Sequence, residues 1–504
     1  MTWRQRPAIL EQTLSRLRRH PHKRKHSLRR NVRMTHPRRR SDERDYQGRS
    51  RMRLSVALIS EGSYPTGKGG VSEWCHSLIN GMKDVRFNVF SMSSEKGLRY
   101  KLPLNVNDVV LEHLHSPNFK HGIDENYAKD LMKELTPALS GAPLDCEEIL
   151  RLSKRRECRA DELLGSDVNW NTAVAYYKEN FDRRAFAHFY IFWTSLFYLL
   201  YKTIEAVGKV PISHIYHTLN AGYAGLLGSL TKLNTGGSLI VTEHGLYLKE
   251  RKFELKNSEI PSWLHGMYEK FFESLVRTSY AYSDTVTSVC NDHTSFQRGI
   301  DPNLENIKVI YNGIDTGKFR LNTIKNNRGC FNIGTVTRIT PIKDILTFIR
   351  SAKYVLEKHE ARFYIIGKVE DEEYFEECQG LVEELGLEEY VKFTGFQDSL
   401  EWYPRLDVFA LPSLSEGFPL TILESLSSGV PCIATKVGGV PEILGEELLV
   451  QKWDPEGLAK KISWLLETPE ERRRIGIEGR KLVERRFSLE RMVNEYRQLY
   501  WAMI

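Results

Sequence analysis

Short apolar runs alternate with longer helical segments along most of this chain. The first run, Leu54 to Ser60, ends in Glu61-Gly62 and is followed by glycines and a helical stretch. Continuous apolar runs of this length, bounded by turn residues, are typical of strands buried in a parallel sheet. Four further runs before residue 290 predict strands of the same kind: Phe87 to Ser91, His214 to His217, Leu239 to Thr242 and Thr285 to Val289.

A second series of apolar runs begins after a polar gap at Asn322 to Arg328. Two successive series of alternating strands and helices predict an α/β protein with two doubly wound, Rossmann-like domains in tandem. We place these domains at residues 52–320 and 328–487, followed by a last helix within residues 488–504. The strands expected in the second series are Phe331 to Thr337, Arg362 to Ile366, Val391 to Phe393, Val408 to Leu411 and Cys432 to Ala434.

One stretch, Ala185 to Tyr201, is rich enough in aromatic residues to raise the question of a membrane span. It has 17 residues, whereas a span needs roughly 20. Its aromatic residues surround the whole helix, which favours a helix buried inside a domain. The region from about 95 to 185, with many Glu, Lys and Arg residues, predicts no particular element.

Charge is divided unevenly along the 504 residues, whose formal net charge is +7. Residues 1–51 hold 17 Lys and Arg against four acids, which leaves 55 basic and 61 acidic residues in the remainder. The folded part is therefore mildly acidic. This excludes the broad positive surface expected of a protein that binds nucleic acid, so we expect no nucleic-acid partner.

The basic segment 1–51 has too few apolar residues to offset the entropy of ordering, and we expect it to be disordered. A solvated tail, or a start placed too early because Met52 sits just before the first strand, is the favoured interpretation. A tether to an anionic membrane or to RNA, and a mitochondrial presequence, are the alternatives.

The seven cysteines lie far apart, form no C-x-x-C pair and are odd in number. This pattern, together with the charged first 25 residues, predicts a reduced cytoplasmic protein without a signal peptide. Peripheral attachment to the inner face of the plasma membrane is compatible with the basic segment.

Two motifs in the first domain place glycine and histidine after strands. Gly69 and Gly70 precede a predicted helix, so their backbone N–H groups and the positive helix end suit a phosphate or sugar oxygen. His244 ends an apolar strand, at the edge where open α/β sheets bind ligands. An ordinary strand-to-helix turn and a structural histidine are the competing interpretations.

Two cations, Arg338 and Lys343, follow the first strand of the second domain. An arginine that binds oxygens in a fork and a lysine that adds a point charge suit a diphosphate. A solvated loop is the alternative.

Two glutamates flank a helix start in the segment from Pro412 to Pro431. Glu416 and Gly417 precede Pro419, which is well suited to a first helical turn, and Glu424 lies within the helix. The free amides of Phe418, Leu420 and Thr421 would then lie at the positive helix end, where a diphosphate leaving group is stabilised. The carboxylates would hold hydroxyl groups of one extended ligand, unless Glu416 is a surface loop acid and Glu424 faces solvent.

In this order, these motifs resemble the retaining GT-B glycosyltransferases of family 4 over roughly residues 52–495. Glu61-Gly-Ser-Tyr-Pro65 and Thr242-Glu-His-Gly245 are most similar to the Pel-type (PelF-like) exopolysaccharide branch. The resemblance implies two domains around a deep interdomain cleft and a last helix that crosses back to the first domain. It also implies transfer of a hexose or N-acetylhexosamine from a nucleoside diphosphate sugar, most often a UDP-sugar, to a glycan or lipid-linked acceptor.

The resemblance implies roles for individual residues as well. Catalytic roles fall to His244, Glu416, Arg338 and Lys343. No D-x-D motif occurs, so we expect no metal and no other cofactor. Donor binding falls to Gly69, Gly70, Gly367, Phe396, Gly417, Phe418, Leu420, Thr421 and Glu424.

Two other functions fit the same two-domain pattern. A UDP-N-acetylglucosamine 2-epimerase would need proton-abstracting acids at the sugar and no acceptor site. A non-catalytic scaffold that binds nucleotide within a membrane-bound polysaccharide synthase would keep the motifs without turnover.

Overall fold

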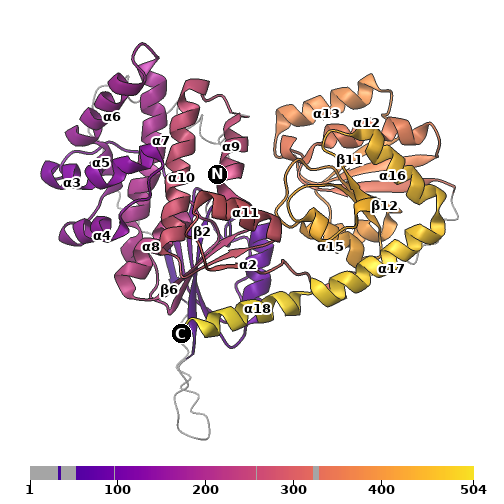
Figure 1. Ribbon diagram of the computed structural model, residues 1–504, viewed down its shortest axis with the longest axis horizontal. Coiled ribbons are helices and arrows are strands. Elements are labelled where there is room, and N and C mark those ends of the chain that lie inside the picture. The colour runs from indigo at the N-terminus through magenta and orange to yellow at the C-terminus, as the bar shows by residue number, and fades with distance from the viewer. Residues whose placement is uncertain (1–31, 36–52, 96, 257, 320, 322–328) are drawn as a thin grey trace, which may run out of the picture. The chain divides into compact units, whose positions relative to one another are not determined.

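The computed structural model describes residues 32–35, 53–95, 97–256, 258–319, 321 and 329–504 (Figure 1). The chain divides into two compact units. Unit 1 comprises residues up to Ser288, Phe296–Lys308 and Leu499–Ile504, and unit 2 comprises Val289–Ser295 and Val309–Gln498. Unit 2 therefore begins ahead of the polar gap that separates the two series of apolar runs.

Unit 1 is built on an eight-stranded sheet in the order β1-β4-β3-β2-β5-β6-β7-β8. The pairs that join β4 through β2 to β7 are parallel. Chain order reverses at β2, so the topological switch point lies between β2 and β5. The strands are β1 (Val32–Thr35), β2 (Ser55–Glu61), β3 (Arg86–Ser93), β4 (Val106–His113), β5 (Ile215–Thr218), β6 (Ser238–Glu243), β7 (Thr285–Ser288) and β8 (Ile307–Val309).

The five strands predicted in this half of the chain all form, but three others were missed. β4 lies in the region for which no element was predicted, because Asn107 and Asp108 interrupt its apolar residues. β8 has only three residues. β1 corrects the expectation of disorder for residues 1–51: its backbone pairs antiparallel with β4, from Val32 opposite Leu111 to Thr35 opposite Asp108. Without β1, β4 would be the edge of the sheet, and an edge strand offers unpaired backbone groups to any added strand. The other residues of the 1–51 segment lie outside the described part.

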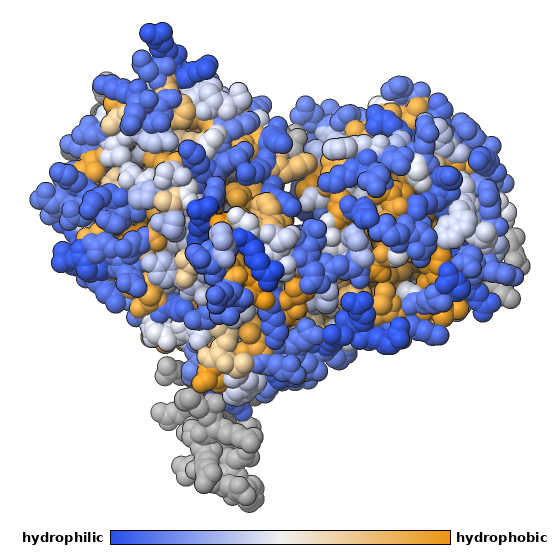
Figure 2. All heavy atoms as spheres, in the orientation of Figure 1, coloured by the Kyte–Doolittle hydropathy of each residue, from blue (hydrophilic) through white to orange (hydrophobic). Residues whose placement is uncertain are grey.

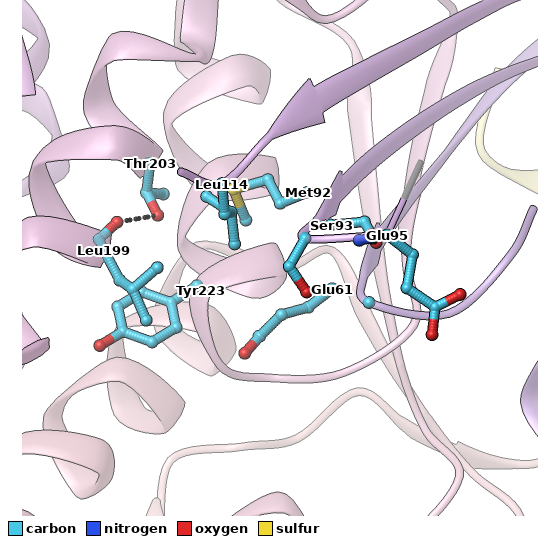
Figure 3. Close-up of a pocket in the computed structure, with 10 residues that line it drawn as sticks. Glu61, Met92, Ser93, Glu95, Leu114, Leu199, Thr203 and Tyr223 are labelled. Atoms are coloured by element: carbon cyan, nitrogen blue, oxygen red, sulfur yellow. Dashed lines mark hydrogen bonds between the residues drawn. The ribbon is translucent and has the colours of Figure 1, made fainter. Parts of the chain in front are cut away.

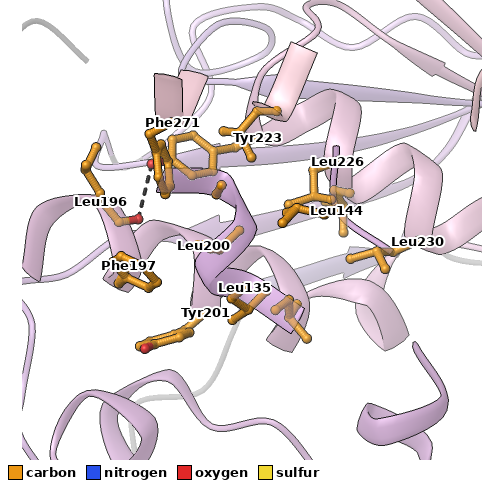
Figure 4. Close-up of a cluster of buried hydrophobic side chains, with 14 of the residues drawn as sticks. Leu135, Leu144, Leu196, Phe197, Leu200, Tyr201, Tyr223, Leu226, Leu230 and Phe271 are labelled. Atoms are coloured by element: carbon orange, nitrogen blue, oxygen red, sulfur yellow. Dashed lines mark hydrogen bonds between the residues drawn. The ribbon is translucent and has the colours of Figure 1, made fainter. Parts of the chain in front are cut away.

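The aromatic stretch forms a buried helix, α7 (Phe186–Glu205), which confirms the prediction of a domain helix. Twelve of its 20 residues are buried, and Figure 4 shows its side chains packed with those of neighbouring helices. Among the described helices, none combines the length and apolar content that crossing a membrane requires. The other α-helices described between β4 and β7 are α3 (Glu125–Leu135), α4 (Cys146–Arg155), α5 (Ala160–Leu164), α6 (Asp167–Asn180), α8 (Tyr223–Thr235), α9 (Tyr247–Lys256) and α10 (His265–Tyr282).

Unit 2 contains a six-stranded parallel sheet in the order β11-β10-β9-β12-β13-β14. The chain moves from β9 to β10 and β11 on one side and returns to β12 on the other, which puts the switch point between β9 and β12. All five predicted strands form. They are β9 (Phe331–Val336), β10 (Ala361–Ile366), β11 (Val391–Gly395), β12 (Val408–Leu411) and β13 (Cys432–Thr435), with the short β14 (Leu449–Val450) added.

The last helix, α18 (Leu489–Ala502), ends within unit 1. The Tyr500 hydroxyl is 2.6 Å from Nδ1 of His217 on β5. The Ser238 hydroxyl of β6 donates to the Met503 carbonyl at 2.9 Å. These bonds fasten the end of the chain to the central strands of unit 1. On the face that Figure 2 shows, hydrophilic side chains cover most of the surface of each unit.

A buried asparagine ties α6 to α7 and generates a stability prediction. Asn169 accepts hydrogen bonds from Trp193 Nε1 at 3.1 Å and from the Tyr201 hydroxyl at 2.9 Å. Asn169→Ala leaves both buried donors without this acceptor, so the free energy of unfolding of unit 1 should fall by about 2 to 4 kcal/mol. Differential scanning calorimetry measures the change. The exposed Asn180→Ala is the control, and equal shifts for the two variants would contradict the prediction.

Candidate functional site

The loops that follow β9 and β12 flank the switch point of unit 2. They are joined by a backbone hydrogen bond, in which the Leu414 amide donates to the Ile342 carbonyl at 2.8 Å. Open α/β sheets bind ligands outside the carboxyl ends of their strands at this point. The loops therefore form the candidate site of unit 2.

A largely buried ion pair links the two loops. Lys343 Nζ lies 2.6 Å from Glu416 Oε1, and the side chains are only 15% and 11% exposed. Asp344, which caps α12 (Ile345–Leu356) from a left-handed conformation with φ +47°, follows Lys343 directly and fixes the end of its turn. The structure thus brings together two residues that the sequence placed in the site independently.

Arg338 is not part of the ion pair between Lys343 and Glu416. Its Nη1 contacts both carboxylate oxygens of Glu370, at 2.6 and 2.7 Å, and its side chain is 59% exposed. Exposed ion pairs are worth roughly 0 to 1 kcal/mol. Separating Arg338 from Glu370 would therefore cost little, whereas Lys343 is held in place by its largely buried pair.

The Glu416 loop rests on a pair of glycines that sequence reasoning did not place in the site. Gly438 has φ +49°, and a Cβ atom there would lie 1.8 Å from the Glu416 carbonyl oxygen. The Gly439 amide donates to the Gly417 carbonyl at 2.9 Å. The two adjacent glycines are visible in the sequence, but their contact with the Glu416 loop is not.

The predicted helix start is α15 (Leu420–Ser427), with Pro419 as its N-cap. Within the described residues no side chain caps this end, so the amides of Leu420 and Thr421 are available to an anion. The Phe418 side chain is 4% exposed and packs against Tyr311 and Phe487. Any contact of Phe418 with a donor is thus limited to its backbone.

Glu424 is oriented by a residue that the site prediction missed. The buried Tyr403 hydroxyl donates to Glu424 Oε2 at 2.9 Å. Burial and the nearby carboxylate raise the pKa of Tyr403 well above its usual range, so the hydroxyl stays a donor. Because the two residues are 21 positions apart in different elements, no local pattern signals the contact.

The two remaining residues of unit 2 that were predicted to bind the donor are Gly367 and Phe396, on the loops after β10 and β11. A Cβ atom at Gly367 would lie 1.7 Å from the Thr337 carbonyl oxygen, so close packing alone requires glycine. Phe396 is 73% exposed. Their roles toward a donor stay predictions.

In unit 1, a tryptophan joins the predicted glycine turn to the predicted histidine. α2 (Gly70–Gly81) begins after Gly69, and a Cβ atom built on Gly69 or Gly70 would meet no atom within 4 Å. Trp74, in the second turn of α2, packs edge-on against His244, with ring centroids 4.5 Å apart. The two motifs therefore lie beside one another in unit 1.

His244 is held in its neutral form. Burial lowers its pKa to about 3. Its Nε2 atom is buried and has no hydrogen-bond partner among the described residues. A buried polar atom without a partner calls for an explanation, and a bound ligand is one. At neutral pH, His244 is thus a hydrogen-bonding group and not a cation.

Metal ligands do not gather in the described part of the chain. No group of three or more His, Cys, Asp or Glu side chains is placed there to hold an ion. The expectation of a metal-independent protein stays a prediction.

Two family profiles match the chain. The profile "Domain of unknown function (DUF3492)" matches residues 54–301. The profile "Glycosyl transferases group 1" matches residues 330–468, which include Lys343, Glu416 and Glu424.

Curated relatives match over part of their length. N-acetyl-alpha-D-glucosaminyl L-malate synthase from Bacillus anthracis is 29% identical over 245 residues, covering 46% of this chain and 63% of that protein. The capsular polysaccharide biosynthesis glycosyltransferase CapM from Staphylococcus aureus is 30% identical over 200 residues, covering 38% of this chain and 52% of that protein. The match thus spans less than two thirds of either relative.

Solved structures match over most of the chain. Sucrose-phosphate synthase from Thermosynechococcus elongatus has a TM-score of 0.58 at 17% identity, covering 89% of this chain and 99% of that one. The Anabaena protein HepE in complex with UDP has a TM-score of 0.60 at 15% identity, covering 89% and 100%. The chain therefore has the GT-B fold of two Rossmann-like domains, and residues 330–468 match a group 1 glycosyltransferase domain.

The buried histidines of unit 1 predict a loss of stability in acid. Burial lowers the pKa of His217, like that of His244, to about 3. Below about pH 6.5 the unfolded chain binds protons that the native state does not, so the free energy of unfolding falls between pH 6.5 and pH 3. Melting temperatures at pH 7 and pH 5 should differ less in His217→Gln than in wild type. The exposed His121→Gln is the control, and an equal drop in all three proteins would refute this origin.

Proposed function

We propose that this protein is a retaining, metal-independent glycosyltransferase of family 4. It transfers a hexose or N-acetylhexosamine from a nucleoside diphosphate sugar, with UDP as the carrier, to a glycan or lipid-linked acceptor. We assign it to exopolysaccharide or glycoconjugate synthesis in the cytoplasm, with the basic residues 1–51 as a contact to an anionic membrane surface or to a membrane-bound synthase.

The observation that carries this proposal is the set of groups around the switch point of unit 2. Lys343 supplies a positive charge fixed by Glu416, and the start of α15 supplies uncapped amides. Both kinds of group stabilise the negative charge that develops on a departing diphosphate. Arg338 adds a third donor, held only by an exposed pair with Glu370.

We assign Glu424 to binding of the nucleoside. The Tyr403 hydroxyl fixes one of its carboxylate oxygens. A carboxylate accepts several hydrogen bonds, and this chemistry suits Glu424 to the two hydroxyls of a ribose. In unit 1, we assign His244 to the donor sugar as a neutral hydrogen-bonding group and Gly70 to the phosphate.

The names of similar proteins support the same class of donor. HepE was solved with UDP, and CapM is named as a glycosyltransferase of capsular polysaccharide synthesis. For retention we propose attack on the same face from which the diphosphate leaves, with the departing phosphate assisting removal of the acceptor proton.

Removal of the Lys343 charge should weaken nucleotide binding. Lys343→Ala loses a charge-assisted contact of about 1.5 to 3 kcal/mol, which is roughly a 10-fold to 150-fold rise in the Kd for UDP by isothermal titration calorimetry. GDP and ADP should bind more weakly than UDP to the wild type. Lys436→Ala, which removes an exposed lysine paired with Glu446, is the matched control.

A second variant separates binding from folding. Lys343→Ala leaves Glu416 buried without its partner, which destabilises the protein. The double variant Lys343→Ala/Glu416→Gln removes both charges and should recover thermal stability without recovering UDP affinity. Wild-type affinity in either variant contradicts the assignment of the diphosphate to this site, and equal affinity for UDP, GDP and ADP contradicts the choice of uridine.

The reaction itself is tested by incubating UDP-sugars with and without glycan acceptors. We expect transfer that proceeds in EDTA and gives a product with the anomeric configuration of the donor, read by NMR, and slow donor hydrolysis without acceptor. Epimerised UDP-sugar from donor alone would favour the epimerase instead. Tight UDP binding without transfer to any acceptor would favour the scaffold.

A further inference from the structure

A pocket lies at the carboxyl edge of the unit 1 sheet, near the switch point between β2 and β5. Its volume is about 60 Å³. Figure 3 shows residues from the ends of β2 and β3 facing side chains of α7 and α8. The labelled lining residues are Glu61, Met92, Ser93, Glu95, Leu114, Leu199, Thr203 and Tyr223.

Apolar and polar side chains both line this pocket. Met92, Leu114 and Tyr223 are buried. The Glu61 side chain extends toward the Tyr223 ring, with Ser93 beside it (Figure 3). Apolar side chains next to hydrogen-bonding groups suit a sugar, which has both apolar C–H groups and hydroxyls.

Glu61 retains capacity to accept hydrogen bonds from a ligand. The Tyr247 hydroxyl contacts its two carboxylate oxygens at 3.3 and 3.4 Å, which are long distances for hydrogen bonds. Tyr247 is itself fixed, because its ring occupies the space that a Cβ atom on Gly222 would need. The Glu61 carboxylate thus lines the pocket while it is in contact with a fixed tyrosine.

Every charged residue that lines the pocket is negative. Glu61 and Glu95 carry these charges, and none of the ten lining residues is Lys, Arg or His. Glu95 faces an exposed Arg99 at 3.9 Å on the rim, and exposed contacts of this kind are weak. The pocket therefore attracts hydrogen-bond donors and repels carboxylates and phosphates.

We propose that this pocket binds one edge of the acceptor saccharide through its hydroxyls and selects against sugar units that carry a negative charge. This rests on the proposed function only in calling the saccharide an acceptor. The volume holds a few water-sized groups, which matches a hydroxymethyl group with neighbouring hydroxyls and not a whole pyranose ring. Glu61 is the specificity-determining residue.

Binding is tested without any donor, on the full chain, by saturation-transfer NMR with methyl glycosides. The neutral probes are the methyl glycosides of glucose, galactose and N-acetylglucosamine, and the matched anionic probes are those of glucuronate and galacturonate. Wild type should bind at least one neutral probe at least fivefold more tightly than its uronate counterpart. Glu61→Gln keeps the shape and removes the charge, so this preference should shrink toward onefold.

Two further variants keep the test decisive. Leu199→Trp fills the pocket without a change of charge and should abolish saturation transfer to the neutral probe. Glu147→Gln, an exposed acid on α4, should leave the preference intact. Uronates that bind wild type as tightly as neutral sugars, a preference unchanged in Glu61→Gln, or no sugar binding at all would each overturn the proposal.

The outcome is separable from that of the proposed function. UDP affinity, which reports on the Lys343 site, is measured on the same samples. Sugar binding without UDP binding would leave the pocket standing and remove the glycosyltransferase assignment. UDP binding without sugar binding would overturn the pocket proposal and leave the glycosyltransferase assignment standing.

Discussion

The ion pair between Lys343 and Glu416 is the contact on which the unit 2 site depends. A buried charge is costly unless an opposite charge is held beside it, so neither loop is free to move its side chain away alone. The parallel order of β9 and β12 makes the pair possible, because it sets the two loops side by side at one sheet edge. The fold thereby fixes a positive charge at the place where α/β sheets bind ligands.

Backbone groups, as well as side chains, shape the unit 2 site. The Glu416 loop lies against Gly438 so closely that any side chain there would collide with it. The same loop leads to Pro419 and the uncapped start of α15. A rigid loop that ends in free amides needs no movement to stabilise a developing negative charge, and preorganised donors of this kind are the most effective.

Local sequence patterns predict most of the strands and the elements on which the candidate site residues lie, but not the contacts of those residues. Buried parallel strands such as β9 and β12 are continuous apolar runs, so they stand out. β4 and β1 do not, because polar residues interrupt one and sheet pairing alone defines the other. In the same way, Glu424 was identified from its place on the helix, whereas Tyr403 was not, since their hydrogen bond depends on tertiary packing.

The interpretation of Arg338 and Lys343 as an equivalent pair illustrates the same limit. Five positions apart in the sequence, they have different electrostatic environments: Lys343 is shielded from water with its partner, and Arg338 is exposed with Glu370.

On the proposed function, these environments suit the two cations to different tasks. A buried charge interacts strongly and at fixed geometry, whereas an exposed one is screened and exchanges partners readily. Lys343 is therefore suited to stabilising charge as it develops, and Arg338 to capturing and releasing an anionic ligand. The pocket of unit 1, whose charged lining residues are both acidic, is suited to neither task. On the proposed assignments, electrostatics favours the anionic carrier at the unit 2 site and uncharged sugar hydroxyls at the pocket of unit 1.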